Sequence, residues 1–295
     1  MSSDFSDRPP SFRQGAALMV GSALLFAAMS AAVKAAAHEL PNAMVVFLRN
    51  ALSLALLAPW VISRGRSALV TRHLREHLVR GLFGLAAMYC FFFSIAHLRL
   101  ADAVLLTYTL PLFVPLVEWL WLGERLSPRL AGPLAVGFVG IVVILRPTPG
   151  LFRPVALLAV LSAVLAAIGQ VGIRRLTATE PAPRIVFYFA AIATAISAVP
   201  AALAWVTPPA QLWPVVAAMG LLATGGQLLL TRAYSSAPAA WVGPFLYTSV
   251  VFSGAFDWLF WRVLPDGLFL AGSVLVVVAA VLTLKLRGKG EPEPA

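Results

Sequence analysis

Two basic residues lie inside apolar segments of about 20 residues, where a charge needs a partner or a cavity. Lys34 lies in the segment 15–37, and Arg49 lies in the segment 42–62. Arg49 is eight residues from the proline that precedes its segment, which corresponds to roughly 12 Å along a helix. The two cations are therefore candidates for binding an anionic group such as a carboxylate. The alternative is that they reach outward to water or pair with Glu39 to fix helix packing.

Five uncharged polar residues lie near the middle of other apolar segments. They are Tyr89, Tyr108, Gln170, Gln227 and Tyr247. A tyrosine in such a place needs a partner for its hydroxyl, and it offers an aromatic face to a solute. A buried amide must likewise be satisfied by a neighbouring helix or by a polar cavity. These residues are predicted to line a solute-binding cavity, and the alternative is that they form hydrogen bonds between helices.

One stretch of the chain recurs. Residues 108–120 and 247–259 align without a gap, because each begins with Tyr-Thr and ends with an acidic residue, Trp and Leu. The matched residues include Tyr108 with Tyr247 and Glu118 with Asp257. Such a match inside apolar sequence is hard to obtain by chance, so the chain is predicted to contain two copies of one unit. Because Tyr108 and Tyr247 occupy equivalent positions, they are the stronger candidates among the tyrosines.

Four residues in or beside the repeated stretch are candidates for gates or hinges. Pro111 and Pro244 each remove a helix hydrogen bond, which permits a kink. Glu118 and Asp257 are acids that can accept a proton, or pair with an arginine when a gate closes. The alternatives are that the prolines give static bends and that the acids lie at the membrane interface beside tryptophans.

The composition excludes several classes of protein. Hydrophobic residues make up 60% of the 295 residues and charged residues 12%, whereas about a quarter of a soluble domain is charged. The net charge of +10 does not indicate nucleic-acid binding, because the cations lie in short loops between apolar segments. The sequence shows no catalytic constellation, no metal-ligand spacing of His, Cys, Asp and Glu, and no phosphate-binding loop. An enzyme, a metal site, a cofactor and an ATP-driven pump are therefore not expected.

Ten segments are long and apolar enough to cross a membrane as helices. They are residues 15–37, 42–62, 78–97, 101–122, 129–145, 154–174, 184–205, 212–232, 240–261 and 267–285. An all-α membrane protein is therefore predicted. Its first five-helix unit covers 15–146 and its second covers 153–285, with terminal segments at 1–14 and 286–295. The first segment is too long for the apolar core of a signal peptide, so it is expected to remain as a helix.

The distribution of Lys and Arg predicts the orientation of these helices. With the N-terminus inside, the inner side holds 16 of the 22 basic residues, Arg80 among them, and the outer side holds four. Both termini are therefore predicted to face the cytoplasm. Because five helices per copy is an odd number, the second copy enters the membrane from the opposite side. Inverted repeats are an architecture of secondary transporters, whose substrate site lies near the bilayer midplane between the halves.

Several short motifs resemble those of one transporter superfamily. They are Leu110-Pro111, Gly123-Glu124-Arg125, Gly132, Gly137 and Gly140, together with Lys34 and Arg49. On these residues the chain resembles the drug/metabolite transporter superfamily over residues 15–285, specifically its members with two EamA repeats. The resemblance implies a ten-helix carrier in which the fifth and tenth helices lie outside a central cavity. Within the superfamily the chain is most similar to the YddG-type aromatic amino acid exporters. The second copy departs from the pattern, because Arg262-Val263 stands where the first copy has Gly123-Glu124.

The expected function is export of amino acids, aromatic or broad-range, by alternating access across a bacterial inner membrane. An amino acid and the lipid bilayer are the expected partners, nucleic acid is not, and a monomer or a homodimer is expected. One alternative is an importer of a metabolite such as S-adenosylmethionine or riboflavin on the same fold. A membrane enzyme or receptor is a more remote alternative, because the inverted repeat and the lack of a catalytic cluster argue against it.

Overall fold

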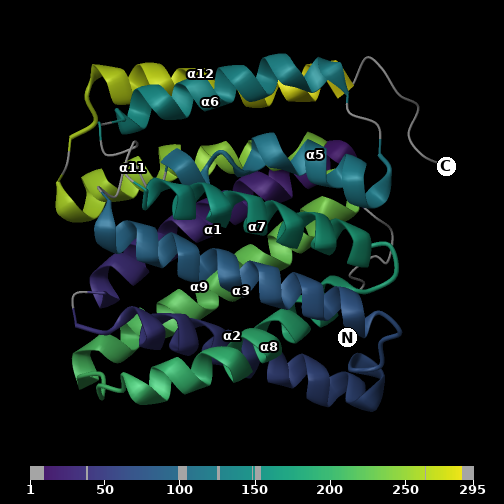
Figure 1. The fold of residues 1–295 in the computed structure, drawn as a ribbon, viewed down its shortest axis with the longest axis vertical. Coiled ribbons are helices and arrows are strands. Elements are labelled where there is room, and N and C mark those ends of the chain that lie inside the picture. The colour runs from purple at the N-terminus through teal and green to yellow at the C-terminus, as the bar shows by residue number, and fades with distance from the viewer. Residues whose placement is uncertain are drawn as a thin grey trace.

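The computed structural model describes residues 10–37, 39–98, 105–124, 127–147, 149, 154–262 and 264–287. This part of the chain consists of helices and loops, without a strand (Figure 1). The long helices of the first half are α1 (Phe12–Ala36), α2 (Asn42–Arg64), α3 (Leu74–His97), α5 (Leu110–Leu122) and α6 (Ala131–Leu145). Those of the second half are α7 (Ala156–Leu176), α8 (Ala182–Leu203), α9 (Trp213–Ser235), α11 (Thr248–Trp261) and α12 (Gly267–Arg287). The short α10 (Ala239–Val242) and the 3-10 helix η5 (Gly243–Tyr247) precede α11.

Nine helical segments of the described part are at least 18 residues long and apolar enough to cross a membrane. The tenth long helix is α3, which has 24 residues. Its first two turns contain Arg75, Glu76, His77 and Arg80. The predicted all-α membrane fold is therefore confirmed. α3 begins at Leu74, before the segment 78–97 that the sequence predicts.

Local sequence signals set several helix ends. Ser11 starts α1 with a capping box, in which the Ser11 hydroxyl accepts from the Gln14 N–H (3.4 Å) and the Gln14 side chain accepts from the Ser11 N–H (2.9 Å). Pro41 and Pro181 directly precede α2 and α8. α5 ends at Gly123, whose φ of 71° lies in the left-handed region that glycine adopts without strain. These signals place the turns where the apolar segments end.

The two halves are arranged as inverted repeats. α1 of the first half packs on α9 of the second. Their equivalents in the other half, α7 and α3, pack on each other in the same way. α2 packs on α8 and α6 packs on α12, so these pairs join equivalent helices of the two halves. Figure 1 shows that α1 begins at the end of the molecule where both termini lie, whereas α7 begins at the opposite end. This pattern of contacts is the one expected of two inverted repeats.

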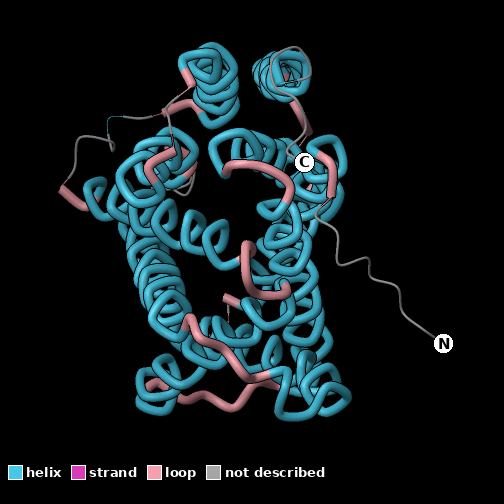
Figure 2. Tube along the Cα trace, turned by 90° about the vertical axis from the view of Figure 1, so that its right-hand side faces the viewer, coloured by secondary structure: helices cyan, strands magenta, loops and turns pink. Residues whose placement is uncertain are grey.

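The helices α6 and α12 form a separate pair at one edge of the molecule, at the top of both views (Figures 1 and 2). A Cβ added to Gly140 would lie 2.8 Å from the Gly272 carbonyl oxygen, and one on Gly272 would lie 2.5 Å from that of Gly140. Small residues allow membrane helices to approach this closely. At one end of the pair Arg146 donates a hydrogen bond to Asp266, which also accepts from the Phe269 N–H of α12 (2.9 Å).

Two helices are interrupted at equivalent positions of the repeats. In the first half residues 105–107 are helical, Tyr108 and Thr109 form a turn, and α5 then begins. In the second half α10 passes into η5, which ends at Tyr247, and α11 follows. The described parts of the predicted segments 101–122 and 240–261 are each long and apolar enough to cross a membrane, and each contains a local break in its winding. The two matched tyrosines stand at the two junctions.

Candidate functional site

Arg49 is a buried cation whose hydrogen-bond partners, in the part of the chain that the structure describes, are neutral. Its side chain projects from α2 and is 6% exposed. The Nε donates to the Met29 sulfur (3.3 Å), and Nη1 donates to the Asn50 side-chain oxygen (3.2 Å). Asn50 is fixed in turn by a hydrogen bond from its amide to the Val46 carbonyl (2.8 Å). The guanidinium is therefore positioned but not neutralised.

Arg80 is a second buried cation, and the sequence analysis missed it. The count of basic residues assigned Arg80 to an inner loop, but α3 starts at Leu74 and carries Arg80 into the bundle, where it is 6% exposed. Its Nη2 donates to the Gln227 side chain (3.3 Å), and its guanidinium lies 4.0 Å from the centre of the Phe189 ring. Its Nε is buried without a hydrogen-bond partner. The loop assignment is therefore corrected.

Arg49 and Arg80, here called the arginine pair, are linked by shared neighbours. Asn50 binds both Arg49 and the Val46 carbonyl, and Val46 packs in one cluster with Phe189, the ring beneath Arg80. Within the described residues, no Asp or Glu forms an ion pair with either of them. Two buried like charges without a counter-ion are unfavourable in a low-dielectric interior. An anionic ligand between them would offset that cost, and a planar guanidinium is suited to bind a carboxylate through two hydrogen bonds.

Three uncharged polar residues of the second half lie on the side of Arg80, and we call them and the arginine pair together the central polar cluster; a Cβ on Gly169, next to Gln170, would lie 3.7 Å from the Arg80 Nη1. Gln227 of α9 accepts from Arg80, as described above. The buried hydroxyl of Tyr234, also on α9, donates to the side-chain oxygen of Gln170 on α7. The predicted residues Arg49, Gln170 and Gln227 thus lie in one region, together with Arg80 and Tyr234. Tyr234 was missed because it stands beyond the end of its apolar segment.

Tyr89 belongs to the same region. It packs against an apolar cluster that contains Val46 of α2 and Phe189 of α8, the residue beneath Arg80. Its hydroxyl is buried without a hydrogen-bond partner. Tyr89 therefore offers an aromatic ring and an unused polar group beside the arginine pair.

Tyr108 and Tyr247 lie elsewhere. Both pack against apolar residues of α6 and α12, including Ile141 and Val276. Tyr247 is fully buried, and Tyr108 is half-buried. The structure therefore places the two matched tyrosines at the seam with the α6–α12 pair, and not in the central polar cluster. A role of Tyr108 and Tyr247 in substrate binding stays a prediction.

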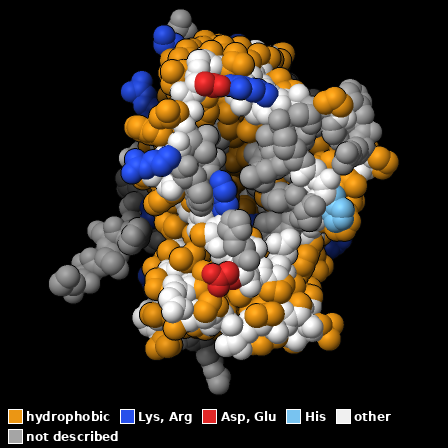
Figure 3. Space-filling model, turned by 90° about the vertical axis from the view of Figure 1, so that its left-hand side faces the viewer, with side chains coloured by type: hydrophobic (Ala, Val, Ile, Leu, Met, Phe, Trp, Pro, Cys, Tyr) orange, Lys and Arg blue, Asp and Glu red, His pale blue; other side chains and the backbone are white. Residues whose placement is uncertain are grey.

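Lys34 lies in the last turn of α1 and is half-buried. It is five residues beyond Met29, the residue that contacts Arg49, which corresponds to about 7.5 Å along a helix. Lys34 therefore lies between the arginine pair and the end of the molecule opposite the termini. Figure 3 views that end and shows it hollowed near its centre.

Glu118 is neither at the surface nor beside water. It is 2% exposed, and its two carboxylate oxygens accept from the backbone N–H groups of Ala239 and of Ala240 (2.8 Å to the latter). These are the first N–H groups of α10, which lack partners inside their own helix. The interpretation of Glu118 as an interfacial acid is therefore wrong, because the residue caps α10 from α5. Its repeat mate Asp257 lies in α11, with its side chain outside the described residues.

The two prolines occupy different settings. Pro111 is buried in the first turn of α5, where no helix hydrogen bond is lost. Pro244 is buried in η5, where the chain is wound as a 3-10 helix. Pro244 remains a candidate hinge. Pro111 lies directly after the break at Tyr108 and Thr109, so it also remains a candidate hinge.

The described residues hold no group of three or more His, Cys, Asp or Glu that could bind a metal ion. Aromatic contacts join α1 to α10 and η5 at the end of the molecule that carries the termini. The Phe12 ring of α1 meets the Trp241 ring at 6.5 Å and the Phe245 ring at 6.2 Å, both edge to face.

Comparison with known proteins identifies the family. The sequence profile of the EamA-like transporter family matches residues 13–146 and again residues 153–285. The chain belongs to the EamA-like transporter family. It is therefore a multi-pass membrane transporter, and the predicted membership in the drug/metabolite transporter superfamily is confirmed.

Relatives of this EamA-like transporter carry different substrates. It is 38% identical to the pseudopaline exporter CntI of Pseudomonas aeruginosa over 272 residues, which cover 91% of this chain and 95% of the other. It is 26% identical to a riboflavin transporter of Brucella anthropi, covering 90% and 97%, and 28% identical to an S-adenosylmethionine uptake transporter of Rickettsia bellii, covering 81% and 82%. The finer resemblance to YddG-type amino acid exporters is not what these relatives indicate.

A solved crystal structure has the same fold as this EamA-like transporter. It matches with a TM-score of 0.80 over 94% of this chain and 99% of the other, at 23% identity. At that identity the likeness concerns the fold alone. The arrangement of ten long helices is therefore shared with an experimentally determined structure.

Proposed function

We propose that this transporter exports a small metabolite with carboxylate groups, an amino acid or a compound of similar chemistry, across the bacterial inner membrane. The observation that carries the proposal is the arginine pair, two buried cations whose partners are all neutral. The pseudopaline exporters, the relatives at 38% identity, support export as the direction. Both termini face the cytoplasm in this proposal, because the basic residues gather in the loops on their side.

The neighbouring residues fit the same chemistry. Each guanidinium offers several N–H donors, and the unused Nε of Arg80 is one of them. Gln227 holds Arg80 in place, and Phe189 and Tyr89 supply aromatic surface to the rest of the solute. A substrate would thus contact residues from both halves, as expected for a site between inverted repeats.

The proposed mechanism is alternating access. In this proposal the contacts of Phe12 with Trp241 and Phe245 act as the closure at the end of the termini, while the opposite end is hollowed (Figure 3). When the transporter changes conformation, the equivalent helices of the other half would close the opposite end. The present state is therefore open toward the outside if the termini are cytoplasmic.

Counterflow in proteoliposomes tests the proposal. The panel contains pseudopaline, labelled amino acids, riboflavin and S-adenosylmethionine. We expect uptake of pseudopaline or of an amino acid, and a decrease in apparent affinity of about tenfold or more for Arg49→Ala and for Arg80→Ala, because each removes charge-assisted hydrogen bonds of ~1.5–3 kcal/mol. The control is Arg64→Ala, an exposed cation in the last turn of α2.

Two outcomes would contradict the proposal. One is transport of riboflavin or S-adenosylmethionine alone, which would favour the importers among the relatives. The other is full transport by both arginine variants, which would make the arginine pair structural. Arg80→Lys separates the effect of charge from that of geometry, because it keeps the positive charge but lacks the planar guanidinium. We expect its affinity for the substrate to lie between those of the parent chain and Arg80→Ala.

A further inference from the structure

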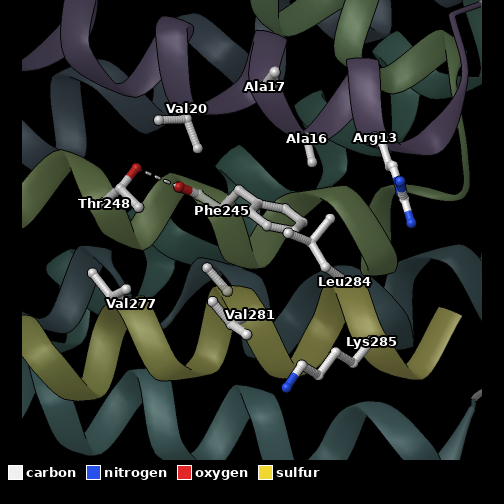
Figure 4. Close-up of a pocket in the computed structure, with 11 residues that line it drawn as sticks. Arg13, Ala16, Ala17, Val20, Phe245, Thr248, Val277, Val281, Leu284 and Lys285 are labelled. Atoms are coloured by element: carbon white, nitrogen blue, oxygen red, sulfur yellow. Dashed lines mark hydrogen bonds between the residues drawn. The ribbon is translucent and has the colours of Figure 1, made fainter. Parts of the chain in front are cut away.

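A groove of about 1050 Å³ opens on the side of the molecule, between α1, η5, α11 and α12 (Figure 4). It exists because α1 packs on α9 while α12 packs on α6, so neither helix closes the space against the other. The small side chains of Ala16, Ala17 and Ala280 widen it. The groove lies apart from the central polar cluster and shares no residue with it.

The lining of the groove is apolar over most of its length. Val20 of α1, Phe245 of η5, and Val277 and Leu284 of α12 contribute to it. The Thr248 hydroxyl is the polar group in the wall, and it donates to the Phe245 carbonyl (2.7 Å). On the lipid-facing side of a membrane protein, a groove with such a lining is suited to bind a hydrocarbon chain.

Both cations of the groove lie at one end. Arg13 comes from the first turn of α1 and Lys285 from the last turns of α12, and Figure 4 shows them on the two facing walls near the same end of the groove, with the Lys285 amine turned away from Arg13. Both are exposed, and neither has a hydrogen-bond or ion-pair partner among the described residues. This is the end of the molecule that carries the termini (Figure 1). The charge thus lies at the membrane surface and the apolar part lies deeper.

The length of the groove fits one leaflet. Along α12 the lining extends from Lys285 to Val277, eight residues, which corresponds to about 12 Å of helix. Half of the hydrocarbon core of a bilayer is about 15 Å. A molecule with an anionic head at the two cations and a chain along the lining would therefore lie as a phospholipid lies in its leaflet.

We propose that this groove is a binding site for an anionic phospholipid. The phosphate lies between Arg13 and Lys285, and one acyl chain follows the apolar lining as far as Thr248 and Val277. Basic pockets between membrane helices bind anionic headgroups in this way. The bound chain contacts Phe245, whose ring also meets Phe12 of the closed end. Lipid binding therefore stabilises η5 and the closure next to it.

Thermal unfolding of the purified full chain in a neutral detergent tests the site. The additives are phosphatidylglycerol, phosphatidylcholine with the same chains, and inorganic phosphate. We expect phosphatidylglycerol to raise the midpoint by about 3 °C or more relative to phosphatidylcholine, and phosphate to leave it unchanged. Native mass spectrometry should show one retained phosphatidylglycerol.

Two kinds of variant locate the effect. Arg13→Gln with Lys285→Gln removes the cations, and Ala17→Leu fills the groove while both cations stay; each should lose most of the shift. The matched control is Arg64→Gln with Arg129→Gln, two exposed cations at the same end of the molecule, which should keep the shift. Because all these side chains are exposed, unfolding midpoints without lipid should stay near that of the parent chain.

Several results would overturn the proposal. An equal shift with phosphatidylcholine would mean that the groove does not select charge. A shift with inorganic phosphate alone would mean a free-anion site at the two cations. An unchanged shift in both the double variant and Ala17→Leu would place the lipid elsewhere, and a dimer that forms through this groove would make a second copy its occupant.

Discussion

Three glycines make the space that one buried arginine occupies. Arg80 lies against Gly84 of its own helix and against Gly169 and Gly172 of α7. A Cβ added to Gly84 would lie only 2.2 Å from the Arg80 Nη1 and 3.1 Å from the Phe189 ring. The position of the guanidinium is therefore set by missing side chains as well as by its bond to Gln227.

Replacing Gly84 should displace Arg80 without unfolding the protein. For Gly84→Ala we expect a weaker apparent affinity for the substrate, by about tenfold if one charge-assisted hydrogen bond is lost. The flexible end of Arg80 can move away, and alanine favours the helix by ~1 kcal/mol over glycine. Transport kinetics and the unfolding midpoint are the measurements. Gly132→Ala in α6 is the control, because a Cβ there meets no atom within 4 Å; equal affinity in both variants would show that Gly84 does not position Arg80.

At the scale of elements, α10 depends on a distant residue. It has four residues and follows Pro238, and its first N–H groups are satisfied by Glu118, a residue more than 100 positions earlier. A pattern read along the sequence cannot show such a cap, because the partner comes from another helix. The interruption of the helix at η5 is likewise a product of packing.

Removing this cap should loosen the closed end. For Glu118→Ala we expect a lower unfolding midpoint, because each buried unpaired N–H costs about 1–3 kcal/mol. We also expect faster thiol labelling at Ser236→Cys, which lies against Gly15 of α1, in a Cys90→Ser background. Glu118→Gln keeps one acceptor oxygen and should have a smaller effect, and Glu124→Gln is the control. Unchanged labelling in Glu118→Ala would mean that the cap does not hold this end closed.

The α6–α12 pair has an ionic contact that should respond to acid. The hydrogen bond from Arg146 lowers the pKa of the Asp266 carboxyl, and the bond from the Phe269 N–H acts in the same direction. Because the folded pKa is depressed, this stabilisation is present above the ordinary value of 3.8 and is lost as the pH falls through the folded pKa. The midpoint of Asp266→Asn should therefore fall less on acidification than that of the parent chain.

A second substitution separates charge from capping at this residue. Asp266→Ala removes both the ion pair and the cap of α12, so its midpoint at neutral pH should lie below that of Asp266→Asn, which keeps the cap. Thermal unfolding at neutral and acidic pH measures both effects. Identical acid sensitivity in all three proteins would show that the contact with Arg146 does not contribute.

At the scale of the whole molecule, the plan of two inverted halves was readable from the sequence. The apolar segments and the match of 108–120 with 247–259 are long-range patterns, and the pairing of α1 with α9 and α3 with α7 agrees with them. Finer features were not readable. A hydropathy window averages over about a helix length and does not resolve single residues near a helix end. Arg80, in the second turn of α3, was therefore counted with the loop residues. The positions of Tyr108 and Tyr247 against α6 and α12 depend on tertiary packing.

Within the described residues the arginine pair has no acidic partner, and we therefore expect transport to depend on membrane voltage. An empty site holds two positive charges, whereas a site occupied by a dianion is neutral and one occupied by a monoanion keeps one charge. One elementary charge moving through 100 mV corresponds to about 2.3 kcal/mol. Turnover with a monoanion should therefore change when a potassium diffusion potential is imposed on proteoliposomes, and exchange of a dianion should respond to a different degree. Equal responses would mean that the electric field does not reach these two arginines.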